Sequence, residues 1–417
     1  MSIAIRTVVA QHLKEAAFLH ARRRTLTGGP SITLPDLARH DERLAAHLDG
    51  LAVAGEEAWP LCLAALDRAA PGAVFVAAVR AVQSRSSDRL DGLFDATGNG
   101  PRARQEIVMA LGWLERDQVQ TVAARLLGSP DPSRQVAGIS TCAAHGIESA
   151  IVSGLGIRDR DLTVHAWILR AAGELGLRDA ASGCAAALSG EDIECRFWAA
   201  WSAVMLGDRN RGLDALTDTG IMPGPHRAGA FRLALQAMDS AAGHSVLQEL
   251  ALDPQQLRWL IRGAGIAGNP AYVSWMIGHM TSARTARTAG EAFSLITGAD
   301  LARLGLDRKP PVTFESGPSD DPDDPDVRMD PDEGLPWPDA SSVDQWWQAH
   351  GSRFPKGTRY FMGGPLTRER CIAVLESGYQ RQRILAAHYL CLLDPGTPLF
   401  NTSAPAWRQQ RLLTKIT

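Results

Sequence analysis

Apolar residues recur at helical spacing along most of the chain, in short segments that end at turn-forming residues. The clearest of these segments is SPDPSRQVAGISTCAAHG, residues 129–146, where Val136 and Ile139 share one face of a helix. Asp131 is placed to accept hydrogen bonds at the start of this helix, and Gly146 can end it in the left-handed conformation. Because sustained alternation of apolar and polar residues is almost absent, the pattern predicts an all-α fold.

A basic residue returns at the same position of successive helical segments. The gaps between these residues are 31 residues four times and then 29. They form what we call the basic column: Arg134, His165, Arg196, Arg227, Arg258 and Arg287. A period near 30 residues is typical of repeats that bury their apolar faces against their neighbours. The sequence therefore predicts an α-solenoid of HEAT-like helical repeats.

Composition divides the chain into four predicted regions. Residues 1–52 are expected to form an N-terminal helical pair, with Asp36 capping the second helix, and residues 53–306 the solenoid. Residues 307–338 are rich in proline and aspartate, which predicts a solvated acidic linker that lets its flanking parts reposition. Residues 339–417 are rich in tryptophan and arginine and are expected to form a small, mostly helical C-terminal module.

Within the predicted C-terminal module, the pattern specifies individual elements. Asp339 is placed to cap a first helix, and the residues RYF at 359–361 suggest a short extended piece. Further helices are expected over residues 368–376, 380–393 and 405–413. The module has the densest aromatic content of the chain, as an independent core of about 80 residues requires.

Charge and cysteine usage narrow the class of protein. The net charge of the 417-residue chain is −3, and between residues 100 and 300 arginines are slightly outnumbered by carboxylates. This balance argues against nucleic-acid binding and gives no general attraction to a membrane surface. The six cysteines are scattered without a CxxC pair, which predicts that most of them are buried thiols in a reducing compartment. The N-terminus lacks the apolar stretch of a signal peptide, so we expect a cytoplasmic protein.

The sequence contains no motif that would assign a catalytic, cofactor or metal site. Nucleotide-binding glycine loops and nucleophile elbows are absent, and the aspartates between residues 320 and 332 lack the glycine and glutamate of a calcium loop. No cofactor or metal is therefore expected. The basic column has two interpretations: it binds a partner that carries carboxylates or phosphates, or it ties adjacent repeats together.

Arginine and tryptophan dominate the energetics of protein interfaces, and both are concentrated near the C-terminus. The residues predicted to bind a partner are therefore the basic column together with Trp346, Trp347, Arg381, Arg383, Trp407 and Arg408. For most of the aromatic residues, the alternative is that they form the core of the C-terminal module.

Several segments also carry a resemblance to a known family. LPWPD, the tryptophan pair at 346–347, RFPKGTRYFMGGPL, GYQRQRILAAHYL and LFNTSAPAWRQQRLL resemble the C-terminal segments of an uncharacterised proteobacterial family of HEAT-like repeat proteins. The early segments DERLAAHLDGLAVAGEEAW and SPDPSRQVAGISTCAAHG also resemble that family. Members of that family tend to be encoded near components of type VI secretion systems. The resemblance implies an adaptor or chaperone role toward a secreted effector or spike component, and it assigns no catalytic residue.

The sequence thus predicts a non-enzymatic scaffold for protein–protein interaction. An enzyme is the first alternative, with a site in or beside the C-terminal module. The residues considered for that site are Arg359, Tyr360, Arg381, Arg383, His388 and Asn401. A weaker alternative is a solenoid that binds nucleic acid along the basic column.

Overall fold

The computed structural model describes residues 5–67, 72–98, 100–147, 161–312, 314, 317 and 329–416. Helices make up most of these residues, so the all-α, solenoid-like prediction is confirmed. The chain forms two compact units. Unit 1 comprises residues 1–28, 32–215 and 394–417, and unit 2 comprises residues 29–31 and 216–393.

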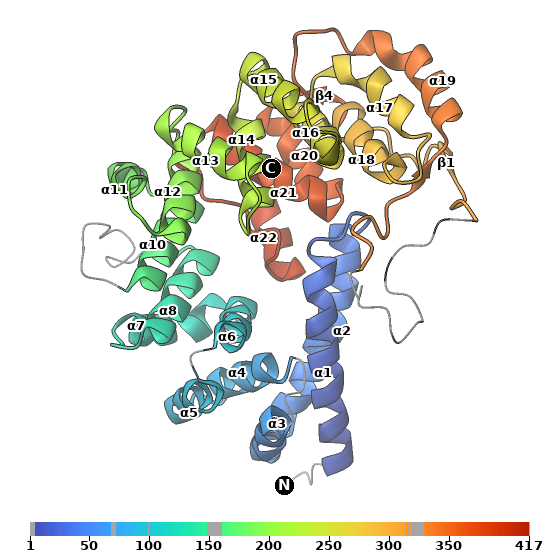
Figure 1. Ribbon diagram of the computed structural model, residues 1–417. Helices are drawn as coiled ribbons and strands as arrows, with labels where there is room; N and C mark the ends of the chain where they lie inside the picture. Colours follow the sequence, from blue (N-terminus) through green and yellow to red (C-terminus); the bar gives the residue numbers. More distant parts are fainter. Residues whose placement is uncertain are drawn as a thin grey trace. The chain divides into compact units, whose positions relative to one another are not determined.

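Unit 1 is built from helices that follow one another along the chain, with one more from its end (Figure 1). They are α1 (Arg6–Leu26), α2 (Leu34–Val53), η1 (Gly55–Glu57), α3 (Ala58–Asp67), α4 (Ala73–Gln83), α5 (Ser87–Thr97), α6 (Pro101–Trp113), α7 (Arg116–Leu127), α8 (Pro132–His145), α10 (Leu162–Glu174), η2 (Arg178–Ala180), α11 (Ala181–Ala187), α12 (Ile193–Met205) and α22 (Ala406–Ile416). The boundary between the units falls within α13 (Arg211–Ile221).

Unit 2 combines helices with two short antiparallel strand pairs, β1 with β2 and β3 with β4. Its elements are α14 (Arg227–Ala237), α15 (Ser240–Ala251), η3 (Pro254–Gln256), α16 (Leu257–Ala267), η4 (Pro270–Tyr272), α17 (Val273–His279), α18 (Ala286–Thr297), β1 (Asp307–Arg308), β2 (Trp337–Pro338), α19 (Ala340–His350), η5 (Gly351–Arg353), β3 (Tyr360–Phe361), β4 (Gly364–Pro365), α20 (Arg368–Ser377) and α21 (Gln380–Leu393).

Alternate helices of each unit pack against one another to form a stacked row. In unit 1 the row is α4, α6, α8, α10 and α12, and α5, α7 and α11 pack against its members. In unit 2 the row is α14, α16 and α18, with α15 packed on α16 and α17 on α18. The basic column occupies the first turns of the row helices from α8 to α18. The sequence period therefore corresponds to one helix pair per repeat.

The ends of the row helices follow the sequence signals closely. Asp131 accepts a hydrogen bond from the backbone N–H of Arg134, as predicted. Gly146 ends α8 with φ +62°, a left-handed conformation that glycine adopts without steric cost. The predicted cap of α2 was wrong: Thr33 is the capping residue, and Asp36 completes the capping box three positions later.

The predicted linker does not behave as a spacer between two separated parts. Its first and last residues are paired in β1–β2, where Asp307 lies opposite Pro338. Asp330 and Asp332 are bound by arginines of α18 and α16, and Asp332 is only 3% exposed. The prediction of a solvated segment is therefore wrong for these two aspartates, because arginines distant in sequence compensate their charges. The aspartates between residues 320 and 328, which lack the sequence pattern of a calcium-binding loop, lie outside the described residues.

The residues predicted to form one C-terminal module divide between the two units after Leu393. Its predicted elements are present: Asp339 caps α19, Tyr360 and Phe361 form β3, and the three helices appear as α20, α21 and α22. These residues therefore do not form one compact body of their own.

In unit 2, the segment around β3 caps three row helices in succession. Arg359 donates hydrogen bonds to the carbonyl oxygens of Leu235, Gln236 and Met238 at the end of α14, and to that of Ala267 at the end of α16. The backbone N–H groups of Tyr360, Met362 and Gly363 bind the carbonyls of Gly268, Leu295 and Ile296. Helix ends leave carbonyls without intrahelical partners, and this segment supplies donors to them.

In unit 1, residues 394–408 serve the same purpose at other row helices. The N–H of Leu399 binds the carbonyl of Glu174 at the end of α10, and Arg408 donates to the carbonyl of Leu114 after α6. Arg23 and Asp41 form a buried ion pair at 2.7 Å, and Asp41 also accepts from the N–H of Ala406. The C-terminal residues are thus an integral part of each unit.

All six cysteines are buried and free, as predicted. Burial raises the pKa of Cys184, Cys195 and Cys371 to about 12, so these thiols stay protonated and poorly reactive. Within the described part of the chain, no helix combines the length and apolar character needed to cross a membrane.

Candidate anion-binding site

Two arginines of the basic column hold the acidic segment of the chain in unit 2. The two terminal nitrogens of Arg258 donate to the carboxylate oxygens of Asp332 at 2.7 and 2.8 Å. Those of Arg287 donate to Asp330 at 2.6 and 3.0 Å. Both contacts are bidentate, the geometry in which a guanidinium binds a carboxylate most strongly. The hydrogen bond from Arg258 to Asp332 is the main reason that the pKa of Arg258 is raised.

The preceding column residue of unit 2, Arg227, has no carboxylate partner among the described residues. Its guanidinium donates to the side-chain oxygen of Gln256 at 2.6 Å and to the carbonyl of Gly220 at 3.3 Å. It lies 4.3 Å from the ring centre of Trp259. Burial lowers the pKa of Arg227, which reflects a positive charge without a negative partner. Arg227 is therefore an open position in the column.

One helical turn further along the same helices, unit 2 contains a pocket of about 270 Å³. Its walls come from α14, α16, α18 and α21. Three arginines and one carboxylate line it: Arg232, Arg262, Arg381 and Glu291. Phe231 and Trp259 form an aromatic wall, with ring centres 5.4 Å apart and the planes nearly perpendicular.

The charges of the pocket are unevenly compensated. Arg381 pairs with Glu291, with nitrogen–oxygen distances of 3.1 and 3.2 Å, and Arg262 lies 3.7 Å from Asp332. No carboxylate of the described residues lies in ion-pair contact with Arg232. Burial lowers the pKa of Arg232, and the charges of Arg262 and Arg381 lower it further. The pocket therefore carries positive charge for which the described chain provides no counterion.

Sequence reasoning identified part of this site and missed the rest. Of the charged residues that line the pocket, Arg381 was predicted to bind a partner. Arg258 and Arg287 of the basic column lie four residues before Arg262 and Glu291 and bind the acidic segment instead. Arg232 and Arg262 were missed. Arg262 follows Arg258 by four residues, which places both on one face of α16, so the helical spacing could have indicated it.

The column residues of unit 1 have different surroundings. Arg134 binds Asp91 at 2.6 Å and Asp95 at 2.8 Å, so it ties α8 to α5. His165 is half-buried in the first turn of α10. Arg196 is exposed and donates to the carbonyls that precede its own helix, those at positions 190 and 191. Some residues of the column thus link adjacent helices, as Arg134 does, and others lie at the surface, as Arg196 does.

The predicted partner-binding residues near the C-terminus lie mostly in internal contacts. Arg383 is fully buried and donates to the carbonyl of Leu375, so its place in a partner surface was wrong. Burial lowers the pKa of Arg383 to about 10. Trp346 packs edge-on against Phe293, with ring centres 5.6 Å apart.

Three further residues predicted to bind a partner have similar roles. Trp347 packs against Phe354, with ring centres 5.6 Å apart. In unit 1, the guanidinium groups of Arg408 and Arg411 lie over the ring of Trp407. Burial lowers the pKa of Arg408 to about 10. Trp347, Trp407 and Arg408 all remain partly exposed.

The residues considered for an enzymatic site are not arranged around one pocket. Asn401 belongs to unit 1 and the other five to unit 2. Arg359 caps helix ends and Tyr360 is buried in β3. His388 is hydrogen-bonded to Gln236 at 3.1 Å, and burial, with the charge of nearby Arg232, lowers its pKa to about 3. Among the described residues, no three histidine, cysteine, aspartate or glutamate side chains are grouped for metal binding.

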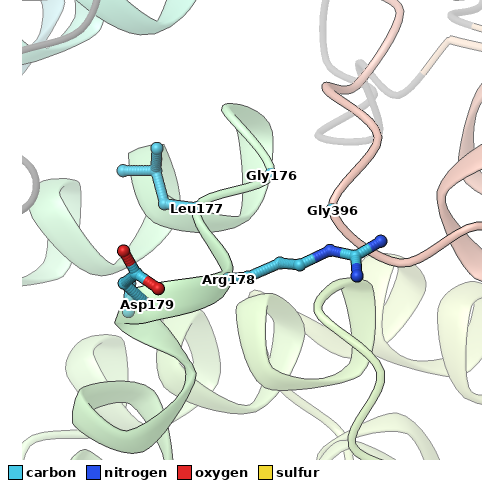
Figure 2. Close-up of a pocket in the computed structure, with 6 residues that line it drawn as sticks. Gly176, Leu177, Arg178, Asp179 and Gly396 are labelled. Carbon is cyan, nitrogen blue, oxygen red and sulfur yellow. The ribbon is translucent and has the colours of Figure 1, made fainter.

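A second pocket, of about 290 Å³, lies in unit 1 beside the turn that follows α10 (Figure 2). Gly176, Leu177, Asp179 and Gly396 line it, and the side chain of Arg178 extends toward the segment that contains Gly396. Arg178 is within 3.3 Å of Asp394. Because its cation already has a carboxylate partner, this pocket is a poorer anion site than the arginine pocket of unit 2.

Comparison with protein-family models, with curated proteins and with solved structures finds no match. The fold defines a helical-repeat protein, and its described site is an arginine-lined face of unit 2.

Proposed function

We propose that the protein is a non-enzymatic scaffold that binds an acidic segment of a protein partner on the basic column of unit 2. The observation that carries this proposal is the bidentate binding of Asp330 and Asp332 by Arg287 and Arg258. These aspartates come from a segment outside the repeats, so the contact is an internal example of the recognition proposed for a partner.

The spacing of the repeats suits an extended acidic segment. Neighbouring packed helices lie about 8–10 Å apart, and two residues of extended chain span about 7 Å. Arginine side chains are long enough to cover the difference. Aspartates two residues apart therefore reach arginines on neighbouring helices, as Asp332 does on α16 and Asp330 on α18.

Arg227 gives a partner a place to bind without displacing the chain's own aspartates. It occupies the equivalent first turn of α14, the next helix of the row, and has no carboxylate partner among the described residues. Trp259 lies beside its guanidinium. An arginine next to an aromatic ring is typical of the residues that dominate interface energetics.

The resemblance of the C-terminal segments supports a finer proposal. The related family is encoded near type VI secretion components, so we propose an adaptor or chaperone that holds a secreted effector or spike component. Chaperones bind their cargo without chemistry, which agrees with a site made of arginines and aromatic residues.

Charge reversal at the open position tests the proposal. The wild-type protein and the variants Arg227→Glu and Arg353→Glu would be purified by affinity from the native host, with quantitative mass spectrometry of bound proteins. Arg353 is an exposed arginine of the same unit without a role in the column, which makes it a matched control. We expect a partner that is retained by Arg353→Glu and reduced at least tenfold by Arg227→Glu, as loss of a charged hydrogen-bonded contact implies.

The acidic character of the contact is tested on the same partner. Cross-linking should map the contact to a segment of the partner that contains closely spaced aspartate or glutamate residues. Recovery of the same partner in equal amounts by all three proteins would contradict the proposal, and so would a cross-linked segment without acidic residues.

A further inference from the structure

The pocket below the basic column differs from the column in shape and in the state of its charges. The column is a row of first-turn positions, whereas the pocket is a half-open hollow of about 270 Å³ lined by residues of four helices. Its lining combines an aromatic wall, Phe231 and Trp259, with the guanidinium groups of Arg232 and Arg262. Ligand pockets typically pair an apolar wall with a few polar groups that fix the orientation of the ligand.

Arg232 is the group that the described chain leaves uncompensated. It is half-buried, and no hydrogen bond or ion pair joins its guanidinium to another described residue. Arg262 and Arg381 repel it, and Glu291 offsets only part of this because Glu291 is already bound to Arg381. Arginine does not lose its proton in proteins, so the positive charge persists. An anion in the pocket would remove this repulsion.

We propose that the pocket binds a small organic anion, a carboxylate or phosphate on an apolar body, with Arg232 and Arg262 contacting the anionic group. Phe231 and Trp259 would contact the apolar body. This proposal goes beyond the scaffold function and does not depend on it, because the groups that would contact the anion, Arg232 and Arg262, differ from Arg227; Trp259 borders both sites.

The pocket is half open and, at about 270 Å³, has room for a small molecule. Benzoate and phenyl phosphate, each an aromatic ring with one anionic group, are suitable probes of this chemistry. Macromolecular ligands are too large to enter, although a single acidic side chain of a partner has the same chemistry.

Isothermal titration calorimetry of the full chain with benzoate and with phenyl phosphate tests the proposal. Benzamide, the neutral counterpart of benzoate, is the control ligand. We expect saturable binding of at least one of the two anions. If benzoate binds, we expect benzamide to bind at least about tenfold more weakly than benzoate, because benzamide lacks the negative charge. The two anions distinguish a carboxylate site from a phosphate site.

Variants assign the binding to the pocket. Arg232→Gln and Arg262→Gln should each weaken binding at least about tenfold, and Arg353→Gln should leave it unchanged. Glu291→Gln removes the carboxylate that competes with the ligand, so binding should tighten. Thermal unfolding of each variant shows that it is folded, and if Arg232→Gln is not folded, Arg262→Gln and Glu291→Gln still decide the question. Absence of saturable binding by both anions would overturn the proposal, as would unchanged affinities in the folded pocket variants.

Discussion

Replacing Asp332 with asparagine should release the acidic segment from unit 2. The carboxylate of Asp332 accepts hydrogen bonds from both terminal nitrogens of Arg258, at 2.7 and 2.8 Å, and from the hydroxyl of Thr288 at 3.1 Å. Its side chain is 4% exposed and that of Arg258 is 35% exposed. Hydrogen bonds to charged groups contribute roughly 1.5–3 kcal/mol each, and the partial exposure of Arg258 reduces this contribution. We therefore expect Asp332→Asn to weaken the attachment of the segment by about 3 kcal/mol.

The cost should appear as faster local opening of the segment. About 3 kcal/mol corresponds to a roughly 100-fold larger opening constant, and therefore to roughly 100-fold faster amide exchange where exchange follows local opening. The amide of Leu335 donates to the carbonyl of Asp332 at 3.0 Å and is a direct reporter. Hydrogen–deuterium exchange with mass spectrometry of the peptide that contains Leu335 would measure this.

Glu333→Gln is the matched control for Asp332→Asn. It makes the same change of charge one residue away, on an exposed side chain, and should leave the exchange rate within a factor of two or three. If Asp332→Asn exchanged as slowly as the wild type, or if Glu333→Gln accelerated exchange equally, the reasoning about the acidic segment would be refuted.

Three other predictions follow from single residues. Arg359→Met leaves four carbonyl oxygens without their donor. We expect it to lower the free energy of unfolding by about 3–5 kcal/mol and the melting temperature by several degrees. The exposed variant Arg353→Met should melt near the wild-type temperature. In Gly268→Ala the new methyl carbon would lie 2.4 Å from a backbone oxygen. We expect this variant to lose well over the ~1–2 kcal/mol of folding stability that Gly146→Ala loses, because at Gly146 only the positive φ opposes a side chain. Thermal unfolding of the two variants measures the difference. Burial and a neighbouring arginine lower the pKa of His388 to about 3, below the value near 6.5 of the unfolded chain, so its contribution to stability is complete above pH 6.5 and is lost as the pH falls. Urea unfolding at pH 7 and 4.5 should show a loss of about 3 kcal/mol, and His388→Gln should abolish that part of the loss.

The fold was predictable because its main signals are local. Asp131 at the start of α8 and Gly146 at its end act within one helix, and the 31-residue period repeats that local pattern. The three helices after residue 367 were also predicted within a few residues of their ends. Each of these elements depends on residues close to it in sequence.

The contacts between distant segments could not be predicted in this way. Proline and aspartate around residue 330 indicate a solvated segment, but Asp330 and Asp332 find arginines more than 40 residues away. The same is true of Arg359 and Arg408, whose acceptors are carbonyls at the ends of distant helices. Backbone carbonyls are the same in every residue, so the sequence contains no pattern that marks them as partners.

The candidate site lies between these two cases. Helical spacing relates Arg262 to Arg258, so that part of the pocket is implicit in the sequence. Arg381 joins the pocket from α21, and its approach to Glu291 depends on how α21 packs in unit 2. The charge imbalance around Arg232 depends on how all four helices pack together, which no local sequence pattern specifies.

The central claim, that the basic column of unit 2 binds an acidic segment of a protein partner, is tested most directly by photo-cross-linking in the native host. A photoreactive amino acid at position 228, next to Arg227 and exposed, would be compared with one at position 353. The account predicts that position 228 cross-links to one protein through a segment rich in aspartate or glutamate, and that position 353 does not. No cross-linked protein at position 228, or the same proteins at both positions, would contradict it.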